Sequence, residues 1–231
     1  MDKARFMDTV DRVFESGGAD GAKLWELAQA AANQAHGTML VISDAAADEA
    51  TRLAAQAIVI ESVPLSTEVL RQATGIDGAV LFSPDGTCHA LGVILDGTAS
   101  DDGDRARGAR FNSALRYLTR PAAPTMIVLV SEDGMIDVLP RLRPRVSRQL
   151  IERALASYQR LTTADEVDGE MRSDAFDRLQ DLAFYLTPEQ CDLVNRLEAE
   201  YQQRQLDSGG IMISGRVLQP NPDMDDAYFI D

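Results

Sequence analysis

Residues 75–95, GIDGAVLFSPDGTCHALGVIL, decide the fold that we predict for this chain. Two apolar runs, AVLFS and CHALGVIL, are separated by PDGT, and an Asp-Gly turn between apolar runs is typical of a β-hairpin. The stretch STEVLRQATG, which leads into them, starts with a serine that can cap a helix and ends with the glycine that commonly stops one. The region therefore predicts a short helix followed by two antiparallel strands.

Single strands between helices, and strands in hairpins, extend on both sides of this region. Upstream we expect helices over 4–16, 21–35 and 44–57 and strands over 38–42 and 58–62. Downstream we expect a helix over 107–119, a hairpin of strands over 125–131 and 135–140, and an amphipathic helix over 145–161. This mixture predicts an α/β fold with a central mixed β-sheet flanked by helices, plus a C-terminal helical appendage.

The composition divides the chain into four parts. We expect an N-terminal helix over 1–20 and the α/β domain over 21–161. The polar stretch TTADEVDGEMRS is typical of a linker, and two helices after it predict a hairpin appendage over 174–205. The tail, 206–231, contains Gly, Pro and Asp without a sustained period, so we expect it to be flexible or ordered only against a partner.

Charge and residue counts exclude several classes of function. A net charge of −15 excludes broad electrostatic attraction to nucleic acids, although a local cradle can still hold a small anion. The chain has no 18-residue apolar run and no apolar signal segment, so we expect a cytoplasmic protein without a membrane span. His36 and His89 are too few for a His-rich metal cage, and we expect structural roles for both. Reduced thiols are expected for Cys88 and Cys191, with one disulfide as the alternative.

The sequence Asp77-Gly78-Ala79 has two interpretations. Its small residues let a ligand approach the backbone, so that free N–H groups can face a phosphate, and Asp77 can hold a divalent metal or accept a hydrogen bond from a hydroxyl. The alternative is an ordinary turn that follows a helix and leads into a buried strand, because Asp-Gly turns are common. The local pattern alone favours the turn.

Three further segments carry residues suited to binding anions or ligands. RGARFNSA (107–114) places Arg110 near a helix start, where anions are favoured, although it also fits an ordinary amphipathic helix. VSEDG (130–134) places Ser131 and Glu132 at a strand end, where ligands often bind, although it also fits a plain turn. RLRPRVSR (141–148) is rich in arginine and either contacts phosphates or an acidic neighbour, or is a solvated helix start.

The order and spacing of these motifs, from about residue 24 to residue 150, resemble the diadenylate cyclase (DAC) domain, which condenses two ATP molecules into cyclic di-AMP. Five blocks match the family pattern in order: GTMLVI (37–42) its glycine-led strand, DGAVLF (77–82) its Asp-Gly-Ala motif, ALGVIL (90–95) its Ala-Gly…Leu strand, GARFNSA (108–114) its Gly-Thr-Arg-His-Arg helix start, and VSEDG (130–134) its Val-Ser-Glu-Glu. The blocks span a little over half of the chain, and the segment after residue 162 has no counterpart in the family.

One family motif is altered in this chain. Where the family has Arg-His-Arg, this sequence has Arg110-Phe111-Asn112, so a histidine and one cationic arginine are lost, and Ala109 replaces a threonine. Cyclase chemistry requires positive groups around the reacting phosphates, and each lost donor typically costs on the order of 10²–10³-fold in rate. Binding survives such losses better than turnover does, because it does not depend on stabilising the transition state.

The resemblance implies roles for particular residues. Asp77, Arg110 and Glu132 would be catalytic, and Asp77 and Glu132 would also hold Mg²⁺ or Mn²⁺. The residues implied for contact with the nucleotide are Gly78, Ala79, Gly92, Leu95, Gly108, Ala109, Asn112, Ser113 and Ser131.

Three functions are open at this point. The altered motif favours a sensor-type protein that binds an adenine nucleotide or a cyclic dinucleotide, with reduced or no cyclase activity. The second is an active, divergent diadenylate cyclase, for which the family requires two domains face to face and hence a homo-oligomer. The third is an adaptor that acts through its C-terminal helices on a protein partner.

Overall fold

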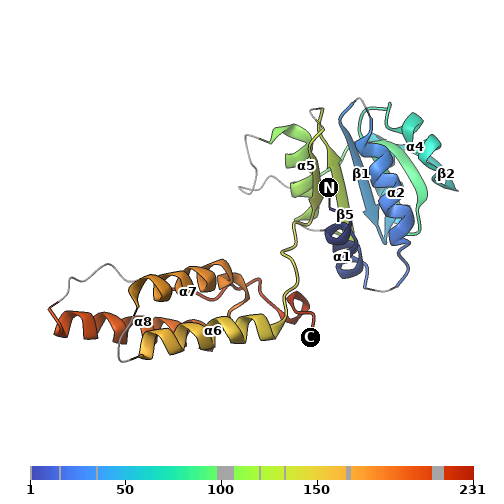
Figure 1. The fold of residues 1–231 in the computed structure, drawn as a ribbon. Helices are drawn as coiled ribbons and strands as arrows, with labels where there is room; N and C mark the ends of the chain where they lie inside the picture. Colours follow the sequence, from blue (N-terminus) through green and yellow to red (C-terminus); the bar gives the residue numbers. More distant parts are fainter. Residues whose placement is uncertain are drawn as a thin grey trace. The chain divides into compact units, whose positions relative to one another are not determined.

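The chain in this computed structural model divides into two compact units, Met1–Leu142 and Arg143–Asp231 (Figure 1). The structure describes residues 2–15, 17–34, 36–97, 107–119, 121–132, 134–164, 168–209 and 216–231. Each unit encloses its own buried apolar residues.

The first unit is built on a six-stranded mixed β-sheet with the strand order β2-β4-β3-β1-β5-β6. The strands are β1 (Thr38–Ser43), β2 (Ile58–Pro64), β3 (Ala79–Phe82), β4 (Thr87–Val93), β5 (Thr125–Val130) and β6 (Ile136–Leu139). β1 is parallel to β3, and the other neighbouring pairs are antiparallel. Both predicted hairpins, β3–β4 and β5–β6, are present, and the predicted mixed sheet is confirmed.

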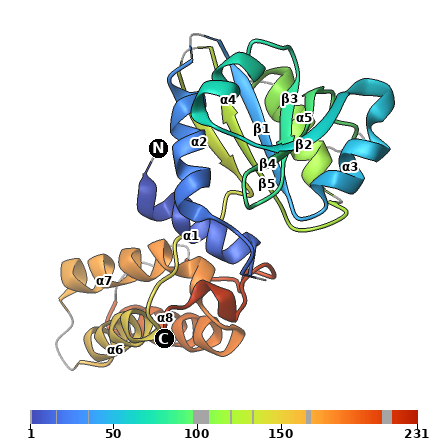
Figure 2. The same cartoon turned by 90° about the vertical axis from the view of Figure 1, so that its right-hand side faces the viewer.

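Helices cover both faces of this sheet (Figure 2). The helices on one face are α1 (Lys3–Val13), α2 (Gly21–Ala32) and α4 (Thr67–Ala73), and those on the other are α3 (Ala46–Arg52) and α5 (Gly108–Leu118). A short 3₁₀ helix, η1 (Ala54–Gln56), follows α3. Successive side chains of a strand point to opposite faces, so Leu40 packs beneath the first group of helices and Val41 beneath the second. The sheet therefore lies between two apolar layers.

The N-terminal helix is part of the first unit, whereas the sequence analysis set residues 1–20 apart. Phe6, Val10 and Phe14 are buried in the same cluster as the α2 side chains. Phe6 meets the only tryptophan of the chain, Trp25, edge to face with ring centroids 5.3 Å apart. The apolar stripe of this helix thus contributes directly to the core beneath the sheet.

The second unit is helical, and its boundary differs from the one predicted. Its elements are α6 (Arg148–Thr163), α7 (Gly169–Asp181), α8 (Pro188–Asp207) and two 3₁₀ helices, η2 (Ala183–Tyr185) and η3 (Asp226–Tyr228). The predicted α/β domain included residues 145–161. In the structure Ile151 and Tyr158 of this helix are buried against α7 and α8, so the boundary lies between Leu142 and Arg143.

The predicted linker over 162–173 is wrong at both ends, because α6 continues to Thr163 and α7 starts at Gly169. α7 starts at Gly169 because the carboxylate of Asp168 accepts hydrogen bonds from the backbone N–H groups of Glu170 and Met171, each at 3.0 Å. This is an ordinary N-cap for which the sequence carried a signal, an aspartate before a helical pattern. Residues 165–167 lie outside the described part of the chain.

The tail was predicted to be flexible or ordered only against a partner, but residues 216–231 pack within the second unit. Phe229 forms a parallel β-bridge with Val146, and the Arg148 guanidinium donates to Asp226 at 2.8 Å. Leu218 is buried, and the side-chain amide of Asn195 bonds both polar groups of its backbone. The order comes from partners at the start of α6 and on α8, which the composition of the tail does not reveal.

His89 and both cysteines have structural surroundings, whereas His36 is exposed. His89 lies between two hydroxyls, Ser83 at 2.6 Å and Ser62 at 3.0 Å, and burial lowers its pKa. Cys88 and Cys191 are both free and buried. Within the described ranges, none of the helices combines the length and apolar character needed to cross a membrane.

Candidate functional site

Three of the predicted site residues, Asp77, Arg110 and Glu132, meet at one edge of the sheet. Because β1 is parallel to β3 and antiparallel to β5, the starts of β1 and β3 lie beside the end of β5. Asp77 comes shortly before β3, Glu132 follows β5, and Arg110 lies in the first turn of α5. The topology thus gathers three residues that are distant in the sequence.

Arg110 links the two predicted carboxylates. Its Nη2 atom is 3.4 Å from Asp77 Oδ1, and its Nη1 atom is 3.8 Å from Glu132 Oε1. The Asp77 and Glu132 side chains are 93% and 82% exposed. Exposed ion pairs of this kind contribute little to the free energy of folding. Arg110, Asp77 and Glu132 can therefore give up their contacts with one another and bind a ligand at a small cost in stability.

Gly37, directly before β1, provides the space that Arg110 occupies. A Cβ atom at this position would lie 2.7 Å from Arg110 Nη1 and 3.1 Å from the carbonyl oxygen of Val130. Any side chain would therefore displace the guanidinium from Glu132. Sequence reasoning treated this glycine only as the start of the first strand and missed its place in the site.

Gly78 lies in the turn before β3 and also packs against the backbone of Gly92 in β4. Its φ is +109°, and a Cβ atom there would lie 2.5 Å from the carbonyl carbon of Gly92, whose own φ is +60°. The two glycines let the entry to β3 lie directly against the end of β4. The absence of a side chain at Gly78 is thus required by its contact with Gly92. The two predicted interpretations, the approach of a ligand and an ordinary turn, did not include this contact.

A cavity of about 410 Å³ lies between the start of α5 and the end of β5. Five predicted site residues line it: Gly108, Ala109, Arg110, Ser131 and Glu132. The other lining residues are Arg107, Phe111, Leu129, Val130, Met135 and Asp137. Its volume lies within the range of small-molecule sites, and its wall combines an apolar surface with a few charged groups, as such sites usually do.

The N-terminus of α5 opens onto this cavity. No side chain of the described residues caps it, and its first turn contains no acidic residue. Gly108 starts the helix with φ at +76°, a left-handed conformation that favours glycine. The first N–H groups of a helix attract anions, and Arg110 adds a full positive charge beside them. This arrangement suits a phosphate group.

Phe111 takes the place at which the family pattern has histidine, and it belongs to the core. Its ring is 7% exposed, with the guanidinium groups of Arg107 and Arg141 at 4.8 and 5.0 Å from its centroid. Both arginines also form ion pairs with Asp137. Sequence reasoning missed Arg107 and Asp137. They line the cavity and form an ion pair, and the position of Asp137 depends on the β5–β6 register. The phenyl ring holds two cations near the cavity but offers no group that transfers a proton.

The remaining predicted residues lie around the cavity or in the core. Ala79 and Leu95 are buried side chains of the core, so contact with a ligand would have to come from their backbone. The side chain of Asn112 donates to the carbonyl of Gly108, at 2.9 Å, within its own helix. Ser113, on the following turn of α5, is half-buried, and it does not line the cavity.

Ser131 supports the turn between β5 and β6. Its backbone N–H and its hydroxyl both donate to the carbonyl oxygen of Met135, at 2.9 and 3.1 Å. The turn interpretation of this residue therefore applies, although Ser131 also lines the cavity.

A polar network that includes the buried side chains of Tyr117 and Glu49 joins α5 to α3. The hydroxyl of Tyr117 donates to Glu49 Oε2 at 2.6 Å, and Arg52 forms a bidentate pair with Glu49 at 2.8 Å for each bond. Arg52 also binds both carboxylate oxygens of Asp96, after β4. The hydrogen bonds from Arg52 lower the pKa of Glu49 and of Asp96, while burial and the Glu49 carboxylate raise the pKa of Tyr117. The network ties α3, α5 and the end of β4 together.

Asp77 and Glu132 form an incomplete set of metal ligands. Within the described residues, no cluster of three or more His, Cys, Asp or Glu side chains could enclose an ion. Mg²⁺ commonly binds one or two carboxylates and completes its shell with water and phosphate oxygens. Two exposed carboxylates beside the uncapped start of α5 fit a metal that arrives with a nucleotide.

The chain matches one family model and several solved structures. The model described as DisA bacterial checkpoint controller nucleotide-binding (DAC) matches residues 26–141. A crystal structure of a double mutant of DacA from Staphylococcus aureus is 22% identical and covers 58% of this chain and 93% of its own, with a TM-score of 0.42. A hypothetical membrane spanning protein from Bacillus cereus is 21% identical and covers 52% of this chain and 59% of its own, with a TM-score of 0.40. No curated protein matches the chain.

Proposed function

Because this chain belongs to the DAC family of DisA-type bacterial checkpoint controller nucleotide-binding domains, we propose that its first unit is a sensor for an adenine nucleotide or a cyclic dinucleotide. The family model covers the whole sheet and α5. In this proposal the ligand occupies the cavity between α5 and β5, and cyclase activity is reduced or absent.

The observation that carries the proposal is the position of Arg110. It lies between Asp77 and Glu132, at the uncapped start of α5 and in the wall of the cavity. We assign the phosphate groups to the first N–H groups of α5 and to the Arg110 guanidinium. Asp77 and Glu132 would hold Mg²⁺ or Mn²⁺, which neutralises phosphate charge when it is bound.

Weak turnover is proposed because two neutral side chains follow Arg110. Transfer of a nucleotidyl group places additional negative charge on the phosphate oxygens, and cations directed at that charge supply much of the catalysis. Phe111 is buried and Asn112 bonds within its own helix, so neither provides a cation or a proton. Arg110 alone supports binding better than it supports catalysis.

An active divergent diadenylate cyclase is the second candidate, and the gathering of Asp77, Arg110 and Glu132 favours it. In that case Asp77 and Glu132 would orient the metal, and Arg110 would stabilise the phosphate charge. Condensation of two ATP molecules needs a second bound ATP, so this candidate also requires a homo-oligomer.

The test combines ligand binding with product analysis. The full chain is titrated with ATP, ADP and cyclic di-AMP in the presence of Mg²⁺ or Mn²⁺, and thermal shifts are followed by the fluorescence of Trp25, in the core of the first unit. The products formed from ATP are identified by mass spectrometry. The variants are Asp77→Asn and Arg110→Gln, with Arg71→Gln, on an exposed position of α4, as a matched control for the loss of charge.

We expect nucleotides to stabilise the chain, and Arg110→Gln to lower their affinity about tenfold or more, because a charge-assisted contact to phosphate is lost. Asp77→Asn should weaken only the metal-dependent part of the binding. Cyclic di-AMP produced by the wild type and not by Asp77→Asn would establish the cyclase instead. No stabilisation by any nucleotide would overturn both candidates and favour an adaptor that acts through α7 and α8.

A further inference from the structure

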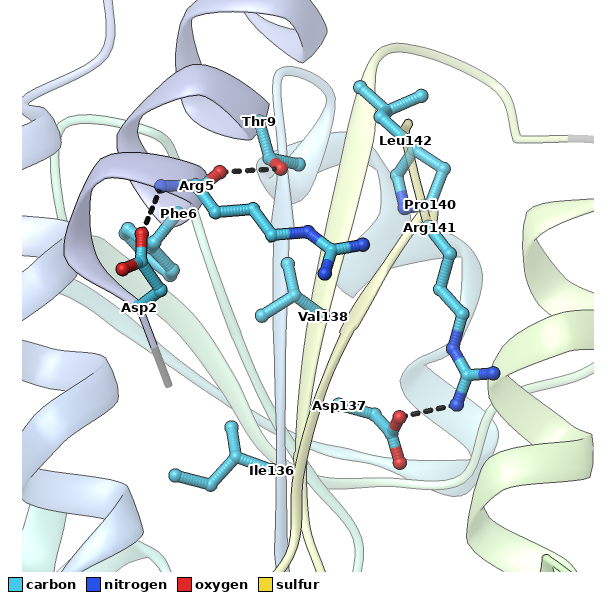
Figure 3. Close-up of a pocket in the computed structure, with 10 residues that line it drawn as sticks. All are labelled: Asp2, Arg5, Phe6, Thr9, Ile136, Asp137, Val138, Pro140, Arg141 and Leu142. Atoms are coloured by element: carbon cyan, nitrogen blue, oxygen red, sulfur yellow. Dashed lines mark hydrogen bonds and ion pairs between the residues drawn. The ribbon is translucent and has the colours of Figure 1, made fainter. Parts of the chain in front are cut away.

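A second cavity lies between α1 and the edge strand β6, apart from the nucleotide cavity (Figure 3). Its volume is about 400 Å³. Ten residues line it: Asp2, Arg5, Phe6, Thr9, Ile136, Asp137, Val138, Pro140, Arg141 and Leu142. Asp137 also lines the nucleotide cavity, but none of the residues assigned to the nucleotide belongs to this set.

One wall of this cavity carries a cation that the fold does not use. The Arg5 side chain extends from α1 toward β6 (Figure 3), and its guanidinium forms no ion pair with any described residue. Two acids lie three residues from Arg5 in the sequence. Asp2 is engaged as the helix cap and accepts a hydrogen bond from the Arg5 backbone N–H at 2.8 Å, and Asp8 forms an ion pair with Arg12 at 3.5 Å. The charge of Arg5 is therefore available to a ligand.

A second cation, Arg141, is held by a shared acid. Asp137 forms ion pairs with both Arg107 and Arg141. One carboxylate divided between two guanidinium groups does not neutralise both. Arg141 therefore keeps the capacity to contact a second anion, in competition with Asp137.

The rest of the lining is largely apolar. Ile136, Val138 and Leu142 are half-buried, and Phe6 closes the cavity toward the core with only 1% of its surface exposed. A fully hydrated inorganic ion gains nothing from such a wall. An apolar group attached to the anion would gain roughly 25 cal/mol for each Å² that it removes from water.

We propose that the cavity between α1 and β6 is a binding site for a small organic anion, with a carboxylate or phosphate head on Arg5 and an apolar body against β6. Arg141 gives secondary support to the head group. The site shares Asp137 with the nucleotide cavity, but Arg5 and the apolar wall belong to it alone.

Ligand-observed NMR on the full chain tests this inference with five probes. Benzoate and phenyl phosphate carry the two head groups, benzyl alcohol is the neutral analogue, and acetate and inorganic phosphate are anions without an aromatic body. We expect both aromatic anions to bind more tightly than all the other probes. The tighter of the two identifies the head group as carboxylate or phosphate.

Single variants locate the site. Arg5→Gln should weaken binding of the aromatic anions about tenfold, the usual effect of losing one charge-assisted contact, and Arg141→Gln should weaken it less. Asp137→Asn should strengthen binding, because it removes the competing acid at nearly constant shape. Arg71→Gln, with the same loss of charge on α4, should leave the affinity unchanged, and a melting curve for each variant verifies folding.

Four outcomes would overturn the inference. The first is that no aromatic anion binds, and the second is that benzyl alcohol, acetate or inorganic phosphate binds equally well. The third is an equal loss of affinity in Arg71→Gln and Arg5→Gln. The fourth is a loss in Arg110→Gln with none in Arg5→Gln, which would assign the probes to the nucleotide cavity.

Discussion

Replacing Tyr117 by phenylalanine tests whether the buried network behind α5 stabilises the first unit. The substitution keeps the ring and its packing but removes a 2.6 Å hydrogen bond to Glu49, a carboxylate whose side chain is only 5% exposed. Hydrogen bonds to a charged group contribute about 1.5–3 kcal/mol, and Arg52 continues to pair with Glu49 in the variant. We therefore expect a loss of about 2 kcal/mol, or roughly 6–8 °C in melting temperature for a unit of this size.

The assay is unfolding by urea and by heat, followed through the fluorescence of Trp25. This is the only tryptophan of the chain and lies in the core of the first unit, so its signal reports that unit. A loss of about 2 kcal/mol should lower the urea midpoint by about 1 M if the slope keeps its usual size. A double-mutant cycle with Glu49→Gln separates the contribution of this pair from other effects.

The pH dependence supplies a second readout. Hydrogen bonding by Arg52, with a further bond from Tyr117, lowers the pKa of Glu49 below its ordinary value of 4.5. The folded state then binds its proton less readily than the unfolded state, so the stabilisation is complete above about pH 4.5 and is lost as the pH falls through the folded-state pKa. The difference between wild type and Tyr117→Phe should shrink over the same range. A change below about 0.5 kcal/mol at neutral pH, or a zero coupling energy in the cycle, would refute the reasoning.

Three further predictions follow from the site and its surroundings. Gly78→Ala should destabilise the first unit by more than about 2 kcal/mol in urea unfolding, because its Cβ would lie 2.5 Å from the backbone of Gly92 at a φ of +109°; an unchanged midpoint would contradict this packing. Restoring the family motif by Phe111→His with Asn112→Arg should raise the yield of cyclic di-AMP from ATP, and no gain by mass spectrometry would indicate a defect elsewhere. Cys88 should react slowly with iodoacetamide at neutral pH when the other cysteine is replaced by serine, because burial raises its pKa to about 11; rapid labelling of the folded chain would show that the thiol is accessible.

The architecture of the first unit could be predicted because its signals are local. The turn between β3 and β4, and the serine that caps α4 by accepting from the Val69 N–H at 3.2 Å, depend on neighbouring residues. Such local signals can be recognised in the sequence without knowledge of the rest of the fold. The boundary at Leu142 was missed because an amphipathic helix shows that it has an apolar face but not which partner covers it.

The sequence proposes members for the site but does not show their contacts. Motif order placed Asp77, Arg110 and Glu132 in one site, and the strand pairing brings them together. The requirement for Gly37 and the sharing of Asp137 depend on strand register, which a single sequence does not specify. For the same reason, the pairing of Gly78 with Gly92 appears only in three dimensions.

The packing of the tail has a consequence for the order in which the chain folds during synthesis. All partners of the first unit's core lie before residue 143, so that unit can complete its structure while later residues are still being added. The second unit must wait, because the segment that leads into α6 bonds with residues 226–231. Until those residues emerge from the ribosome, the aromatic rings of η2 lack the Tyr228 and Phe229 contacts that cover them. The second unit can therefore complete its aromatic packing only after residues 228 and 229 have been synthesised.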